Sequence, residues 1–248
     1  MSLPASLRYS GWMIRDAAVR PGSAAVVFAA LFAFLATRLP GPLSAAAADT
    51  LLVRMLGQMD WLLVLIATTG MVSWDRTSGF YRSLFSHPVN PSLYYFERWV
   101  LAGLGAVLVI PLTALALFLV SGSFPWSGPL VVRFLIKYLL LGGLTFAFST
   151  VLRADWVFAF TISLVQSILH GLERVGAPLS EFTRLLAHAL PPLHIGSAEG
   201  LASRFVQGGR LAYPTSGELT HALLYGAGIL CLALAVLRVR PLGSGGRA

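Results

Sequence analysis

The chain has 248 residues, of which 56% are hydrophobic and only 11% are charged, and its mean hydropathy is +0.76. Soluble domains carry about 25% charged residues, so this composition excludes a soluble globular protein and indicates a polytopic membrane protein. The net charge of +8 comes from arginines that are scattered along the chain. This pattern fits loops and lipid headgroups better than a nucleic-acid surface, and we expect no nucleic-acid partner.

The first residues have the pattern of a helix that lies on the membrane surface. Leu7 and Ile14 share one side of a helical wheel, and Arg8 and Arg15 form a neighbouring stripe. An apolar face beside a basic stripe is typical of an interfacial helix, which we predict within residues 1–21. A frayed leader is the alternative.

Six apolar runs follow, and they predict an all-α polytopic membrane protein with six transmembrane helices. The predicted spans are Gly22–Leu39, Leu51–Ser73, Arg98–Val120, Pro129–Leu152, Trp156–Leu172 and Leu219–Leu237. Pro111 lies inside the third span, where it predicts a kink. Because the sequence contains no internal repeat, we expect residues 1–248 to form a single transmembrane domain.

Charge predicts the orientation of these spans. With the N-terminus inside, the inner segments hold ten arginines against four acids, and the outer segments hold seven arginines against six acids. The positive-inside rule therefore places both termini in the cytosol. The outer loop over residues 173–218 has two short stretches of helical periodicity, which predict short outer helices before the last span.

Residues 74–97 form the longest segment between spans in the N-terminal half. Phe80, Tyr81, Leu84 and Phe85 fall at i, i+1, i+4 and i+5, which places them on one face of a short helix. An aromatic face flanked by arginines suits docking to a cytosolic partner, and packing on the bilayer is an equal alternative.

Prolines set the limits of this short helix. Pro88 ends it after about two turns. Asn90-Pro91 is typical of an N-cap followed by proline at the first helical position, so the helix of the third span is predicted to start near residue 91. A push on the short helix would then move the whole third span.

The order of these parts resembles the permease subunits of ABC-2-type exporters, with the heme-exporter B-type permeases as a narrower relative. The motif that carries the resemblance is Asp75-Arg76-Thr77-Ser78-Gly79-Phe80, followed by Leu84-Phe85-Ser86-His87-Pro88-Val89-Asn90-Pro91. The resemblance implies a bacterial inner-membrane exporter whose cytosolic coupling helix docks an ATPase. The docking residues that it implies are Asp75, Arg76, Gly79, Phe80, Tyr81, Arg82, Leu84, Phe85 and Pro88.

The resemblance also implies the partners of this chain. The ATP-binding motif G-x-x-x-x-G-K-[ST] is missing from the sequence, so ATP and Mg²⁺ would bind to a separate ABC ATPase subunit. A second permease copy or a homologue would complete the pathway, with membrane lipids around it. We expect no cofactor, metal or enzymatic activity in this chain itself.

Two charged residues fall inside predicted spans. Asp60 and Lys137 each lie about 12 Å from the outer end of their span, at about 1.5 Å per residue. A charge in the membrane needs a partner or water. We therefore predict that Asp60 and Lys137 form an intramembrane pair or line an outer cavity. A purely structural pair, or a lysine that reaches for the membrane surface, is the alternative.

Three functions are compatible with these patterns. The first is a permease that moves an amphipathic or lipid-like substrate when a separate ATPase hydrolyses ATP. The second is a non-transport scaffold or assembly protein that docks a cytosolic partner. The third, a secondary transporter, is disfavoured because paired broken helices in two repeated halves are missing.

Overall fold

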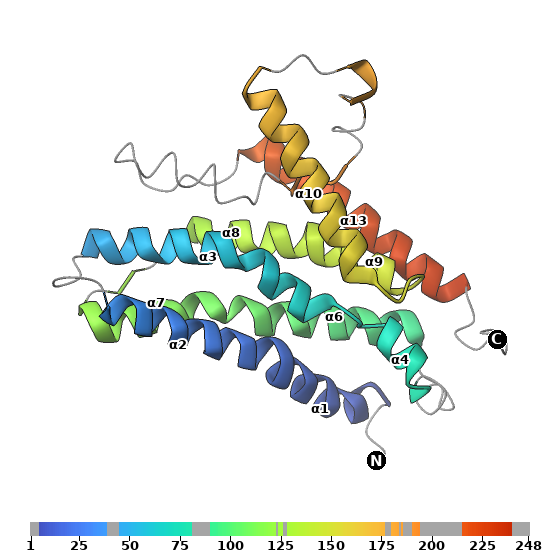
Figure 1. Cartoon of the computed structure of the whole chain (residues 1–248). Helices are drawn as coiled ribbons and strands as arrows, with labels where there is room; N and C mark the ends of the chain where they lie inside the picture. Colours follow the sequence, from blue (N-terminus) through green and yellow to red (C-terminus); the bar gives the residue numbers. More distant parts are fainter. Residues whose placement is uncertain are drawn as a thin grey trace.

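A computed structural model describes residues 5–38, 45–80, 90–122, 124–125, 128–176, 180–183, 185, 190–193 and 215–239. Regular structure in these residues is entirely helical (Figure 1). The elements are α1 (Ala5–Ala17), the π-helical turn η1 (Ala18–Gly22), α2 (Ser23–Thr37), α3 (Ala45–Thr68), α4 (Ser73–Thr77), α6 (Pro91–Val107), α7 (Val109–Ser121), α8 (Gly128–Lys137), the π-helical turn η2 (Tyr138–Gly142), α9 (Gly143–Ser149), α10 (Asp155–Arg174) and α13 (Ser216–Val239).

Five helical runs among the described residues are long and apolar enough to cross a membrane. They are Gly11–Thr37, Pro91–Ser121, Gly128–Ser149, Asp155–Glu173 and Leu219–Val239. The second predicted span corresponds to a pair of segments, Ala47–Arg54 and Met59–Thr77, which meet at a bend of 46° (Figure 1). A sixth crossing results only if this bent pair counts as one span. The fold is thus that of a polytopic helical membrane protein, which confirms the predicted class.

The N-terminal helix differs from its prediction. We expected an interfacial helix that ends before a first span beginning at Gly22, but α1, η1 and α2 form one helical run. Pro21 lies within η1, and the wider π-helical turn accommodates a residue that has no N–H to donate. The proline therefore changes the local geometry of the helix without ending it.

The start of the third span is as predicted. Asn90 is the N-cap of α6 and has extended dihedrals, and its side chain accepts hydrogen bonds from the backbone N–H groups of Ser92 at 3.0 Å and Leu93 at 3.5 Å. Pro91 occupies the first turn. This confirms the predicted cap. The helix then runs without a break to Val107.

An interruption separates α6 from α7 at Leu108. Pro111 explains its position, because a proline cannot donate to the carbonyl four residues earlier and its ring crowds that carbonyl. The carbonyl concerned belongs to Val107, the last residue of α6. The sequence predicted a kink at Pro111, and the structure shows an interruption of the helix at Leu108, on the N-terminal side of the proline.

The helices pack into a bundle with a distinct group at one end (Figure 1). In the bundle α2 packs along α7, and α3 contacts both α6 and α8. In the second group α9 contacts α10 and α13. Several helix ends lie at the same end of the molecule, which we call the α4 end (Figure 1). They are the start of α1, the whole of α4, the start of α6, the joint between α9 and α10, and the last turns of α13.

The predicted outer loop lies mostly outside the described residues. Within it, Ser180 accepts a hydrogen bond from the backbone N–H of Thr183 at 3.2 Å, a capping contact at the start of a helical turn. Leu193 is buried, and its backbone N–H donates to the side-chain oxygen of Gln166 in α10 at 3.0 Å. This contact places residues 190–193 against α10.

Candidate functional site

The connection between α3 and α4 is held by side chains of the α9–α10 joint. Ser149 accepts hydrogen bonds from the backbone N–H groups of Val72 at 2.8 Å and Ser73 at 3.0 Å. Asp155 accepts from the backbone N–H of Gly70 at 2.8 Å. Gly70 has φ = 72°, a left-handed conformation that favours glycine. A sharp turn therefore presents three N–H groups to two acceptors from another part of the chain.

Arg98 joins α4 to α1 and α6. Its Nη1 donates to Asp75 Oδ2 at 2.7 Å and to the carbonyl of Met71 at 2.9 Å. Its Nε and Nη2 donate to Asp16 Oδ2 at 3.1 and 2.7 Å. The Tyr95 hydroxyl adds a hydrogen bond of 3.2 Å to Asp75. One largely buried guanidinium, on a side chain that is 11% exposed, therefore connects three helices through charge-assisted hydrogen bonds, which are the strong class of such bonds.

The predicted docking residues Asp75 and Arg76 are both at least half-buried, and each contacts a residue outside α4. Asp75 is only 6% exposed and belongs to the Arg98 contacts, so it is part of the interior and not of a docking surface. The reason is that Arg98 and Tyr95, one turn apart on α6, both point their polar ends at its carboxylate. Arg76 is half-buried, and its Nη1 donates to the carbonyl of Thr150 at 2.9 Å.

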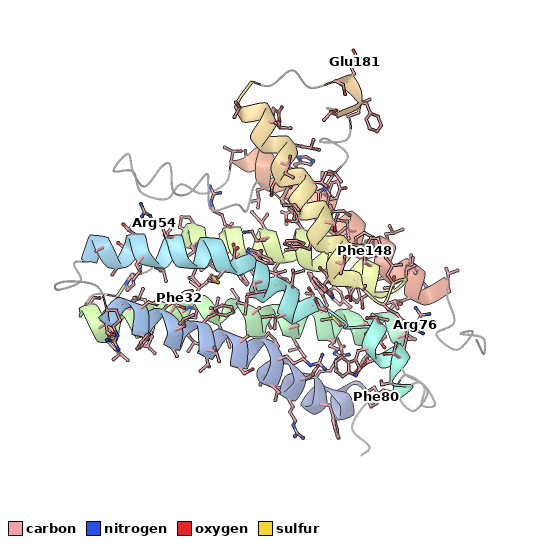
Figure 2. All side chains as sticks on the ribbon, in the orientation of Figure 1. Phe32, Arg54, Arg76, Phe80, Phe148 and Glu181 are labelled. Atoms are coloured by element: carbon pink, nitrogen blue, oxygen red, sulfur yellow. The ribbon has the colours of Figure 1, made fainter. Side chains whose placement is uncertain are left out.

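The next two docking residues lie at the edge of the described region. Gly79 has φ = 73°, again a conformation that suits glycine. Phe80 is 47% exposed and lies at the α4 end together with Arg76 (Figure 2). The other predicted docking residues lie outside the described residues: Tyr81, Arg82, Leu84, Phe85 and Pro88.

The two predicted intramembrane charges meet. Lys137 Nζ donates to both carboxylate oxygens of Asp60, at 2.6 Å each. Both residues are about 7% exposed, so the pair is buried between α8 and α3. The predicted pairing is present. Arg133, one turn before Lys137 on α8, is also buried, whereas Arg54 on α3 is exposed (Figure 2).

Sequence reasoning missed most of the contacts at the α4 end. It treated Arg98, Asp16 and Asp155 only as charges that set the orientation, and it gave Ser149 no role. The available signal was that acids and arginines both occur near the ends of neighbouring helices. Which acid pairs with which arginine depends on helix packing, and that information is not local.

No group of three His, Cys, Asp or Glu side chains in the described part of the chain is arranged to hold a metal ion. The arrangement can instead act mechanically. Polar contacts join a short helix, α4, to α1, α6 and the joint between α9 and α10 at one end of a membrane protein, and a contiguous polar network of this kind is one physical route by which a displacement can pass between helices.

Fold and site together define a polytopic helical membrane protein in which polar contacts join several helix ends at the α4 end. The chain matches no protein-family model, no curated protein and no solved structure.

Proposed function

We propose that this chain is the membrane-spanning permease subunit of an ABC exporter, in which ATP hydrolysis by a separate ATPase chain moves an amphipathic or lipid-like substrate. The ATPase docks on the segment that begins at Gly79 and Phe80. A second copy of the chain, or a homologue, completes the pathway. The α4 end then faces the cytosol of a bacterium, and the chain lies in the inner membrane.

The observation that carries this proposal is the contact between Arg98 and Asp75. The proposed docking segment follows α4 directly, and it precedes the Asn90 cap of α6. A force on it therefore reaches α6 twice: along the backbone through the cap, and sideways from Asp75 to Arg98. Because α6 continues into α7, the run of 31 residues from Pro91 to Ser121 would move with it.

The contacts of Ser149, Asp155 and Arg76 support the same proposal. They connect the α3–α4 turn and α4 to the joint between α9 and α10. A displacement of α4 would thus reach a second group of helices. A scaffold that merely binds a partner does not require the helix before its docking segment to contact so many helix ends.

Purification of the tagged full chain from membranes in mild detergent tests the proposal. We expect an ATP-binding chain with a Walker motif to co-purify, and the reconstituted complex to hydrolyse ATP. Phe80→Ala should weaken ATPase binding about tenfold, as truncation of an aromatic anchor does. Phe124→Ala is the matched control, because Phe124 is 51% exposed and follows α7, far along the chain from α4.

Two results would contradict the permease function. One is a purified chain that brings down no ATP-binding protein. The other is a complex that binds a partner through Phe80 and yet shows neither ATP hydrolysis nor substrate movement in proteoliposomes. The second result would favour the scaffold function.

A further inference from the structure

Arg20 of η1 is held in place but leaves most of its donors unused. Its guanidinium lies over the ring of Trp74, 5.0 Å from the ring centre. Its Nε lies 3.4 Å from Asp16 Oδ1, a long ion pair at a partly exposed position. Within the described residues its guanidinium donates no hydrogen bond. Stacking on an aromatic ring orients the planar group and leaves its edge open to an acceptor.

The nearest carboxylate is already occupied. Asp16 Oδ2 accepts two hydrogen bonds from Arg98, at 3.1 and 2.7 Å, and both are shorter than the 3.4 Å contact between Asp16 Oδ1 and Arg20. Asp75 likewise pairs with Arg98. Arg20 therefore shares one acid with a better-placed competitor, and its charge is only partly compensated.

The α4 end as a whole carries surplus positive charge. The charged residues there whose side chains are described are six arginines and four acids: Arg15, Arg20, Arg76, Arg98, Arg153, Arg238, Asp16, Asp75, Glu97 and Asp155. Arg15 is exposed, and Arg76 donates to a neutral carbonyl. The surplus of two charges favours an anion at this end.

A cavity of about 10 Å³ lies beside Arg20, and Asp16, Thr69 and Arg98 also line it. Space of this size accommodates a single small polar group, such as one oxygen of a phosphate. The cavity lies between η1, the α3–α4 turn and α6. An anion that contacts Arg20 could therefore place one oxygen there without any movement of the helices.

The depth of Arg20 indicates where the anion comes from. From Arg20 to Thr37 the helical run rises about 26 Å, close to the thickness of the hydrocarbon core. Arg20 thus lies at headgroup depth. Trp12 and Trp74 nearby are 71% and 59% exposed, and exposed tryptophans are enriched at the interface between membrane and water.

We propose that Arg20, stacked on Trp74 beside this cavity, binds the phosphate group of an anionic phospholipid. The site forms between η1 and α4, so the lipid connects the first helical run to the segment that follows the α3–α4 turn. The proposal does not depend on the permease function, because its readout is lipid binding alone.

Titration of the detergent-purified full chain with phosphatidylglycerol tests the proposal, with bound lipid counted by native mass spectrometry and Tm followed in parallel. We expect saturable binding that raises Tm and weakens with salt. Arg20→Gln should weaken binding about tenfold, since it removes charge-assisted hydrogen bonds. Arg20→Lys keeps the charge but loses the planar guanidinium, so it should lose less affinity than Arg20→Gln. If Arg20→Gln lowers the Tm of the lipid-free protein, Arg20→Lys replaces it as the test variant.

The chain offers a matched control at the other end of the same helical run. Arg38 lies over Phe34 at 4.9 Å, so it is also a stacked arginine at a membrane interface. Arg38→Gln should leave the affinity for phosphatidylglycerol unchanged. Trp74→Phe should retain binding, whereas Trp74→Ala should weaken it.

Four results would overturn the proposal. The first is an unchanged affinity of Arg20→Gln for phosphatidylglycerol, and the second is a loss of that affinity in Arg38→Gln equal to the loss in Arg20→Gln. The third is binding of phosphatidylcholine as tight as that of phosphatidylglycerol. The fourth is an equal rise in Tm when inorganic phosphate is added at the concentration at which phosphatidylglycerol acts. The second would mean that any interfacial arginine suffices, and the last that the ligand is a soluble anion.

Discussion

Lys137 contacts both carboxylate oxygens of Asp60 at 2.6 Å, and this ion pair joins α8 to α3 in the buried part of the bundle. A buried ion pair gains little over a well-packed apolar pair, but removal of one partner leaves an uncompensated charge. The presence of the pair therefore adds little net stability, whereas the loss of either partner destabilises the structure.

Lys137→Met should lower the free energy of unfolding by about 3 kcal/mol, because Asp60 is left buried without its partner. The double variant Asp60→Leu/Lys137→Met should recover most of this loss. Equilibrium unfolding in mixed micelles measures both, with Arg54→Gln on the exposed side of α3 as the control. Additive losses in the double variant would show that the two residues do not act as a pair.

Asp75→Asn and Asp16→Asn should differ, although both acids bind Arg98. The Asp75 side chain is 8% exposed and that of Asp16 is 34% exposed. Asp75→Asn should therefore cost about 2 kcal/mol, because Arg98 loses the more buried of its two carboxylate partners. Asp16→Asn should cost less than about 1 kcal/mol, and the effect should shrink as salt is added. Equal losses, or a salt-independent loss for Asp16→Asn, would contradict this assignment.

The features that the sequence predicted correctly are local ones. Apolar runs indicated the spans because each helix must satisfy its own backbone in the membrane. The cap at Asn90 could be predicted because the amides that it accepts from, those of Ser92 and Leu93, are only two and three residues away. Pro111 likewise acts on the preceding turn. The N-terminal segment was expected to be an interfacial helix separate from a span that begins at Gly22. The structure instead has one helical run in which a π-helical turn includes Pro21, and composition does not indicate this.

The features that the sequence did not predict depend on packing. Asp75 was grouped with docking residues because it belongs to the motif that carries the family resemblance, yet Arg98 lies 23 residues further along and binds its carboxylate in the interior. Asp60 and Lys137 are the exception, because matching their depth in two spans needs only the rise per residue. Depth alone does not identify Ser149 as the acceptor for the α3–α4 turn.

Ser149→Ala should loosen the α3–α4 turn. Val72 and Ser73 would each lose the acceptor of a buried N–H group, at a cost of about 2 kcal/mol. Hydrogen exchange should become faster at both amides. Ser149→Thr retains the hydroxyl and is the control. Unchanged exchange at Val72 and Ser73 would show that another group takes over the acceptor role.

Asn90→Ala should destabilise the start of α6 by about 1 kcal/mol, because the amides of Ser92 and Leu93 lose the side-chain oxygen that caps them. Asn90→Asp keeps an acceptor and should be nearly neutral. Hydrogen exchange at these two amides is the direct measurement. If exchange instead rises uniformly along α6, the effect is global and the cap is not its cause.

Gly103→Ala should overpack the contact between α6 and η2. A Cβ at this position would lie 2.6 Å from a ring carbon of Tyr138. The ring has little freedom to move, because its hydroxyl donates to the carbonyl of Trp99 at 2.6 Å and the two rings are 4.9 Å apart. Overpacking of this kind costs about 1–3 kcal/mol.

The control for Gly103→Ala is Gly228→Ala, since a Cβ at Gly228 in α13 meets nothing within 4 Å. That variant should be neutral or stabilising, because alanine favours helix by up to about 1 kcal/mol over glycine. Thermal unfolding in detergent separates the two variants. Removing the ring should relieve the clash, so Tyr138→Ala combined with Gly103→Ala should be no less stable than Tyr138→Ala alone. A further loss in the double variant would mean that α6 approaches η2 closely for a reason other than this ring.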